Sequence, residues 1–168
     1  DEKITLIDNV KYYLYDEMIS RISDVIDPAR IDLIVQNHVE MDHSSSLPAM
    51  MEVSPKAKLV CSAKGKKGLY EHYREMGFEK WDIQVVRTGD EISIGKKTMQ
   101  FIEVVMLHWP DSMHTYLKED RILFSNDAFG QHIATSERFE DQVEGVMEDA
   151  QIYYANILMP FGKQVLGY

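Results

Sequence analysis

The sequence predicts an α/β sandwich with a mixed sheet. Three apolar, β-rich segments alternate with helical segments up to Gly77, and this alternation is typical of βα units. A block of short β-runs separated by turns follows, and one further helix lies near the C-terminal end. Because the β-block contains no crossover helices, the pattern does not favour a doubly wound parallel fold.

The first half of the chain carries clear signals for helix ends. In the first helix apolar residues recur at helical spacing from Tyr15 to Ile26, and Asp27-Pro28 closes it. Ser44 to Ser46 offer N-cap candidates for the second helix, and Gly77 ends the third. The predicted strands span 4–10, 31–35 and 57–62, and the predicted helices span about 15–26, 46–53 and 66–76.

The second half consists of β-runs and a final helix. Turns at Thr88-Gly89-Asp90 and Gly95-Lys96-Lys97 separate the first runs, and a hairpin turns at Glu119-Asp120. A helix over about 141–158 is expected to end at Pro160. The predicted strands span 82–87, 91–95, 98–106, 114–118 and 121–126. The helix residues expected to face inward are Val143, Val146, Met147, Ala150, Tyr154, Ile157 and Leu158.

Length and composition describe a globular domain. The chain has 168 residues, of which 45% are apolar and 27% charged, and its net charge of −10 argues against nucleic acid and anionic lipid as partners. No apolar run approaches about 18 residues and no signal peptide is visible. With a single cysteine, a cytoplasmic protein is the simplest interpretation. Cys61 is the only cysteine, which excludes an internal disulfide, and we expect it to be buried and inert.

Both ends of the sequence suggest a domain that is cut. The first strand starts almost at once, and the last eight residues, FGKQVLGY, begin an element that does not finish. We therefore expect residues 1–168 to form a partial domain.

The stretch His38-Val39-Glu40-Met41-Asp42-His43 directly follows the strand at 31–35 and is rich in metal-ligand types. Residues 38, 40 and 42 have the same parity, so an extended backbone would point their side chains to one side. Imidazole and carboxylate groups are the common ligands of first-row metals. The alternative interpretation is a polar turn that caps the next helix.

Two other strands end in the same way. The strand at 98–106 leads to His108, and the strand at 121–126 leads to Asp127. If Glu40, Asp42 and Asp127 share a cleft, each pair of carboxylates about 4 Å apart repels by roughly 4 kcal/mol at an effective dielectric constant of about 20. Two cations bound between the carboxylates would turn this repulsion into attraction, and Asp127 could bridge the two cations.

The segments HVEMDH, LHWPDSM and FSNDAFGQH, with a step of 19 positions from His108 to Asp127, resemble those of the flavodiiron proteins. These are oxygen and nitric oxide reductases with a metallo-β-lactamase-like domain. The resemblance covers most of the chain and implies a metallo-β-lactamase-like αβ/βα sandwich, truncated at both ends. It also implies that O2 is reduced to water, or NO to N2O, at two non-haem irons with electrons from FMN.

The resemblance further implies roles for individual residues. His38, Glu40 and His108 would hold one iron, Asp42 and His43 would face the second iron, and Asp127 would bridge them. The family's last ligand is a histidine beyond Tyr168. FMN would bind a flavodoxin-like domain outside this chain. The resemblance also implies a head-to-tail homodimer or a higher oligomer, and an electron donor such as rubredoxin or a reduced flavin system.

Glu40 distinguishes the main function from its rival, a binuclear zinc hydrolase of the metallo-β-lactamase superfamily. The hydrolases have a second histidine at this position, and a carboxylate shifts the preference from zinc toward iron or manganese, although zinc can substitute. A metal-poor, inactive fragment is a third possibility. Tyr153 or Tyr154, of which we favour Tyr154, resembles a family tyrosine that could donate a hydrogen bond to bound oxygen, with core packing as the alternative.

Overall fold

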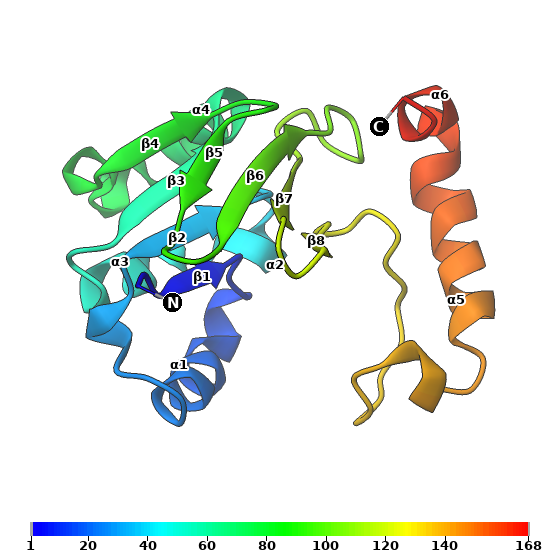
Figure 1. Cartoon of the computed structure of the whole chain (residues 1–168), viewed down its shortest axis with the longest axis horizontal. Helices are drawn as coiled ribbons and strands as arrows, with labels where there is room; N and C mark the ends of the chain where they lie inside the picture. Colours follow the sequence, from blue (N-terminus) through cyan, green and yellow to red (C-terminus); the bar gives the residue numbers. More distant parts are fainter. Residues whose placement is uncertain (1, 168) are drawn as a thin grey trace.

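The computed structural model describes residues 2–167 and contains two four-stranded sheets stacked face to face (Figure 1). The first sheet is entirely parallel, with the order β1-β2-β3-β4. Its strands are β1 (Thr5–Ile7), β2 (Leu33–Gln36), β3 (Lys58–Ser62) and β4 (Ile83–Val86). The helices between them are α1 (Tyr15–Ser23), α2 (Met41–Ser44), α3 (Leu47–Val53) and α4 (Ala63–Tyr73). Short 3-10 turns span Tyr12–Leu14, Pro28–Arg30, Arg74–Met76 and Phe78–Lys80.

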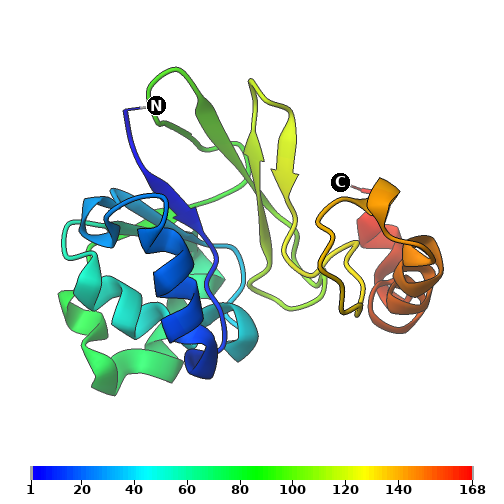
Figure 2. The same ribbon diagram turned by 90° about the horizontal axis from the view of Figure 1, so that it is seen from below.

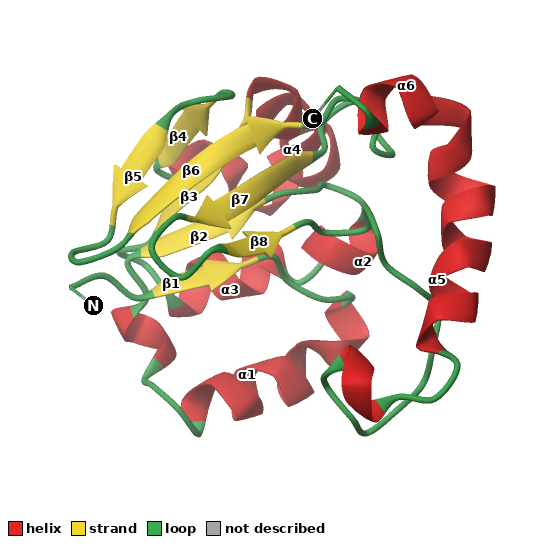
Figure 3. Ribbon diagram, turned by 45° about the vertical axis from the view of Figure 1, so that its right-hand side comes forward, coloured by secondary structure: helices red, strands yellow, loops and turns green. Residues whose placement is uncertain are grey.

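The second sheet is entirely antiparallel, with the order β5-β6-β7-β8, and it lies in front of the first in Figure 3. Its strands are β5 (Glu91–Ser93), β6 (Thr98–Glu103), β7 (Met113–Leu117) and β8 (Ile122–Phe124). Gly95, in the predicted turn between β5 and β6, has a φ of 116°, which side chains disfavour.

Buried apolar side chains form a core on each face of the parallel sheet. Figure 2 shows α1, α3 and α4 on one side of the sheets and the C-terminal segment on the other. The core under the helices contains, among others, Ile31, Ile34, Leu47, Met50, Leu59, Cys61 and Leu69. The core between the sheets contains Leu33, Val35, Val60, Val86, Ile94, Met99, Phe101 and Met113. Cys61 is fully buried as predicted, and burial raises the pKa of its thiol to about 12.

The C-terminal segment is a long helical rod. After the 3-10 turn Glu140–Gln142 it contains α5 (Val146–Tyr153), a π-helical turn (Tyr154–Leu158), a 3-10 turn (Met159–Phe161) and α6 (Gly162–Val165). Its buried Leu158 packs against Val104, Leu107 and Ala128, which lie in the loops after β6 and β8. The rod therefore contacts the end of the sandwich where those loops meet.

The structure confirms the predicted α/β sandwich but corrects several details. The strands do not form one mixed sheet: β4 follows the crossover helix α4 and pairs parallel to β3, whereas turns join the later strands, which pair antiparallel. Pro160 does not end the helical rod, because it lies in the first turn of a 3-10 helix, where a missing N–H costs no hydrogen bond. Met147 is 60% exposed instead of facing inward.

Among the described residues, no helix combines the length and the apolar character that crossing a membrane would require.

Candidate metal centre

The loop after β2 carries the first group of candidate ligands. All four residues of β2 are buried, and His38, two residues after the strand, is fully buried. Helix α2 begins at Met41, so Glu40 is its N-cap residue and Asp42 and His43 lie in its single turn. The predicted extended backbone over residues 38–42 is therefore wrong for Asp42. The helical turn instead carries Asp42 and His43 to a second group beside the first.

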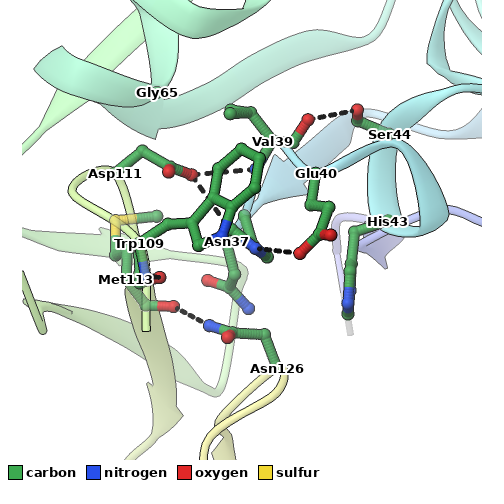
Figure 4. Close-up of polar contacts among 12 residues, drawn as sticks. Asn37, Val39, Glu40, His43, Ser44, Gly65, Trp109, Asp111, Met113 and Asn126 are labelled. Atoms are coloured by element: carbon green, nitrogen blue, oxygen red, sulfur yellow. Dashed lines mark hydrogen bonds and ion pairs between the residues drawn. The ribbon is translucent and has the colours of Figure 1, made fainter. Parts of the chain in front are cut away.

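The loops after β6 and β8 carry His108 and Asp127. Asn126, just before Asp127, has a φ of 48°, a left-handed conformation that asparagine tolerates. Its side-chain Nδ2 donates a hydrogen bond to the carbonyl of Met113 at 2.8 Å, drawn in Figure 4, and its Oδ1 accepts from the backbone N–H of Asp127 at 2.6 Å. These bonds fix the start of the loop that presents the Asp127 carboxylate.

Two groups of potential metal ligands meet at Asp127. In the first, ligand atoms of His38, Glu40, His108 and Asp127 all lie within 4.8 Å of one another. Here the Nε2 atoms of His38 and His108 are 3.2 Å and 3.3 Å from Asp127 Oδ2. In the second, Asp42, His43 and Asp127 meet the same criterion. Here His43 Nε2 is 2.8 Å from Asp127 Oδ1, so each group faces a different oxygen of one carboxylate.

The donor set fits two cations. Asp127 Oδ2 is buried and has no hydrogen-bond partner among the described residues, although two imidazole nitrogens lie close to it. A buried carboxylate oxygen without a partner is costly, and a cation between these atoms would satisfy it. Carboxylate oxygens and imidazole nitrogens together suit iron, zinc or manganese.

Asp111 orients the first group, a role that the sequence analysis did not assign. Its Oδ2 lies 3.0 Å from His38 Nδ1 and accepts a hydrogen bond from the backbone N–H of Val39 at 2.8 Å (Figure 4). The bond to Nδ1 leaves His38 Nε2 free to face Glu40 and Asp127, which is how carboxylates commonly orient metal-binding histidines. The only available signal was its position in the loop that also carries His108.

The charges in the metal-free site compensate one another. Burial alone would lower the pKa of His43, but its hydrogen bond to Asp127 and the charges of Asp127, Asp8 and Asp42 raise it to about 9. Burial alone would raise the pKa of Asp127. The hydrogen bond from His43 and the charges of the His43, His38 and His108 imidazoles lower this pKa below its usual value. Both pKa shifts favour the charged forms, a protonated His43 beside an ionised Asp127.

A second unpredicted carboxylate, Asp8, lies beneath the loops. It accepts hydrogen bonds from the Asn37 backbone N–H at 2.8 Å and from the Gln36 side chain at 3.3 Å. Burial raises the pKa of Asp8 to about 6, against the lowering effect of its bonds to Asn37. Gln36 also donates hydrogen bonds to the carbonyls of His38 and His43. Through Gln36, Asp8 is therefore connected to both ends of the segment 38–43.

Of the two adjacent tyrosines, Tyr153 is the one whose hydroxyl is influenced by the charges of the acidic groups. Tyr153 is 8% exposed. Its burial is the main cause that raises the pKa of its hydroxyl to about 12, and the negative charges of Asp127, Glu40 and Asp42 contribute the rest. Tyr154 packs with Leu158 in the apolar cluster, which is the alternative that the sequence left open.

Comparison with known proteins shows the family of the chain. Residues 1–164 match the family described as ODP family beta lactamase. The chain belongs to this family. Its relatives include a nitric oxide reductase of Moorella thermoacetica, 45% identical over 98% of this chain and 41% of that protein.

Solved structures extend this ODP family assignment. The rubredoxin oxygen:oxidoreductase of Desulfovibrio gigas is 43% identical, with a TM-score of 0.94 over 99% of this chain and 41% of that one. The flavodiiron protein of Giardia intestinalis is 44% identical, with a TM-score of 0.92 over 98% and 40%. These matches confirm the resemblance to flavodiiron proteins and the metallo-β-lactamase-like fold. The chain spans about two fifths of the length of these relatives.

Proposed function

We propose that this chain is the dinuclear iron domain of an oxygen or nitric oxide reductase. In one reaction O2 takes up four electrons and four protons to give two water molecules. In the other, two NO molecules take up two electrons and two protons to give N2O and one water molecule. The names of the relatives, nitric oxide reductase and rubredoxin oxygen:oxidoreductase, support an oxidoreductase over a zinc hydrolase.

The observation that carries this proposal is the position of Asp127 between two groups of ligands. His38, Glu40 and His108 would hold one ion, Asp42 and His43 would hold the other, and Asp127, whose two oxygens face the two groups, would serve both. Glu40 and Asp127 supply hard anionic donors to the first ion, which favours iron over zinc.

The side chains around the ions have separate tasks. Two bound iron ions would supply the electron transfer to O2 or NO that no side chain can provide. Asp111 holds His38 in the tautomer that presents Nε2 to the site. Tyr153 keeps its proton at neutral pH, because its pKa is about 12, and can donate a hydrogen bond toward the acidic pocket.

We further propose that electrons reach the site from FMN on a separate domain, that a rubredoxin or a reduced flavin system supplies this FMN, and that the working assembly is a head-to-tail homodimer or a higher oligomer. The name of the Desulfovibrio relative supports a rubredoxin-type donor.

Metal counting and gas measurements test the proposal. The purified chain is loaded anaerobically with Fe²⁺, reduced with a photoreduced flavin and supplied with O2 or NO. We expect at least one iron per chain, held by His38, Glu40, His108 and Asp127, and catalytic gas uptake with N2O formed from NO, whereas Asp127→Asn should lose both iron and activity. Absence of metal binding would refute the proposal. Hydrolysis of a chromogenic lactam by the zinc-loaded chain, without gas uptake by the iron-loaded chain, would establish the hydrolase instead.

A further inference from the structure

Val39 lies between the candidate ligands His38 and Glu40 and is held at both backbone polar groups. Its N–H donates to Asp111 Oδ2 at 2.8 Å, and its carbonyl accepts from Ser44 Oγ at 2.7 Å. Figure 4 shows both bonds, with Asp111 and Ser44 on opposite sides of Val39. The side chain of Val39 is only 4% exposed, so its packing partners also fix the loop.

Helix α4 supplies that packing through a glycine. A Cβ atom built on Gly68 would lie 2.8 Å from Val39 Cγ2, closer than real Cβ atoms approach, and one on Gly65 would lie 3.8 Å from Val39 Cγ1. Glycine is a poor helix former, yet both residues lie inside this 11-residue helix, three positions apart and therefore on one face. The missing side chains let the helix backbone lie directly against Val39.

The same helix also reaches the carbonyl side of Val39. The Tyr73 hydroxyl lies 2.8 Å from Ser44 Oγ, and since the Ser44 proton is given to the Val39 carbonyl, Tyr73 acts as the donor. Tyr73 is 3% exposed. Helix α4 thus contacts Val39 directly through Gly68 and indirectly through Tyr73 and Ser44.

We propose that helix α4 positions the loop that carries His38 and Glu40. Gly68 determines where Val39 lies, and the position of Val39 determines the directions of the His38 imidazole and the Glu40 carboxylate. This inference rests on the proposed metal site. A Cβ built on Gly68 also lies 3.5 Å from Val39 Cβ and 3.6 Å from Val39 Cγ1, so rotating the Val39 side chain does not make room for it, and both polar groups of the Val39 backbone are already bonded. The displacement is therefore transmitted to the neighbouring ligands His38 and Glu40. Functional sites hold such ligands within about 0.5 Å of their productive positions.

The test is a steric rescue between two residues. Gly68→Ala should weaken metal binding roughly 10- to 100-fold, the range typical of lost support around a ligand. Val39→Ala removes the methyl group that the new Cβ meets, so the double variant should bind within about threefold of Val39→Ala alone. Gly162→Ala is the matched control, because this helical glycine has no atom within 4 Å of a built Cβ, and its binding should equal that of the wild type.

Three readouts separate positioning from general destabilisation. Co²⁺ is titrated by its visible absorption, stability is measured by urea unfolding, and the His38 ring nitrogens are followed by NMR in the metal-free chain. We expect the His38 signals to shift in Gly68→Ala and to return in the double variant. Wild-type affinity in Gly68→Ala, or a loss that Val39→Ala does not rescue, would overturn the inference while leaving the proposed function intact.

Two further outcomes also decide the matter. If Gly68→Ala does not fold, Tyr73→Phe removes only the hydroxyl bonded to Ser44 and should weaken Co²⁺ binding about threefold or more, and unchanged binding would overturn the inference. If the wild-type chain binds no metal, the proposed function and this inference fall together.

Discussion

His114 is a buried histidine whose replacement should change how stability depends on pH. It lies on β7, it is 4% exposed, and its Nε2 has no hydrogen-bond partner among the described residues. Its neighbour across the sheet is Ile102, and its ring lies 6.4 Å from that of Phe129. Burial lowers the pKa of His114 to about 4, so the folded chain keeps this imidazole neutral at pH 5.

The unfolded chain takes up a proton at this position below about pH 6.5, whereas the folded chain does so only near pH 4. The free energy of unfolding therefore falls as the pH decreases through this window. The contribution of His114 is about 2 kcal/mol between pH 7 and pH 5, and about 3 kcal/mol when the window is crossed completely. The raised pKa of Asp8 makes the free energy of unfolding rise as the pH decreases, which is opposite to the effect of His114. The contribution of His114 is therefore isolated by comparing the wild type with a variant at this position.

The comparison uses His114→Leu, which keeps a similar volume and removes the titration. Urea unfolding of the metal-free proteins is followed by tryptophan fluorescence at pH 7 and pH 5. Between pH 7 and pH 5 the free energy of unfolding of the wild type should decrease by about 2 kcal/mol more than that of the variant. At pH 7 the variant should be at least as stable, since the partnerless nitrogen is gone. Equal losses in both proteins would refute the reasoning, because they would mean that the folded state protonates His114 freely.

Three further predictions concern the site and the helical rod. Asp111→Asn should lower metal affinity roughly 10- to 100-fold, measured by competition with a chelator, because His38 loses its orienting carboxylate. In the metal-free chain His43 should titrate near pH 9 by NMR, and Asp127→Asn should move this pKa toward 6.5; a value that does not move would contradict the assigned pair. Leu158→Ala should cost about 2 to 5 kcal/mol in urea unfolding, and a negligible loss would show that the rod does not depend on this contact.

The sequence could predict the buried strands because their composition is unambiguous. The segments 31–35 and 57–62 consist mostly of apolar residues, as expected for parallel strands covered on both faces. The β-runs themselves do not show that the strands divide into two sheets, because a short β-run carries no signal for the sheet in which it pairs. That division depends on which strand follows a crossover helix and which follows a turn.

The site was predictable in its residues and less so in its local geometry. All six candidate ligands meet in two groups, and their metal binding stays a prediction. The helical turn at 41–44 is too short to show a periodicity, so an extended backbone looked equally suitable. Asp111 escaped notice because its role depends on a contact with His38, 73 residues earlier. Tyr153 and Tyr154 are adjacent on a helix and point about 100° apart, and only packing decides which faces the site.

The metal-free chain already contains the electrostatic arrangement that two cations would take over. The carboxylates of Glu40, Asp42 and Asp127 would repel one another, and a protonated His43 and the nearby imidazoles offset that repulsion. A metal ion at His43 has to displace its proton, since the bound form of histidine is neutral. Metal binding at the second group is therefore coupled to the release of that proton.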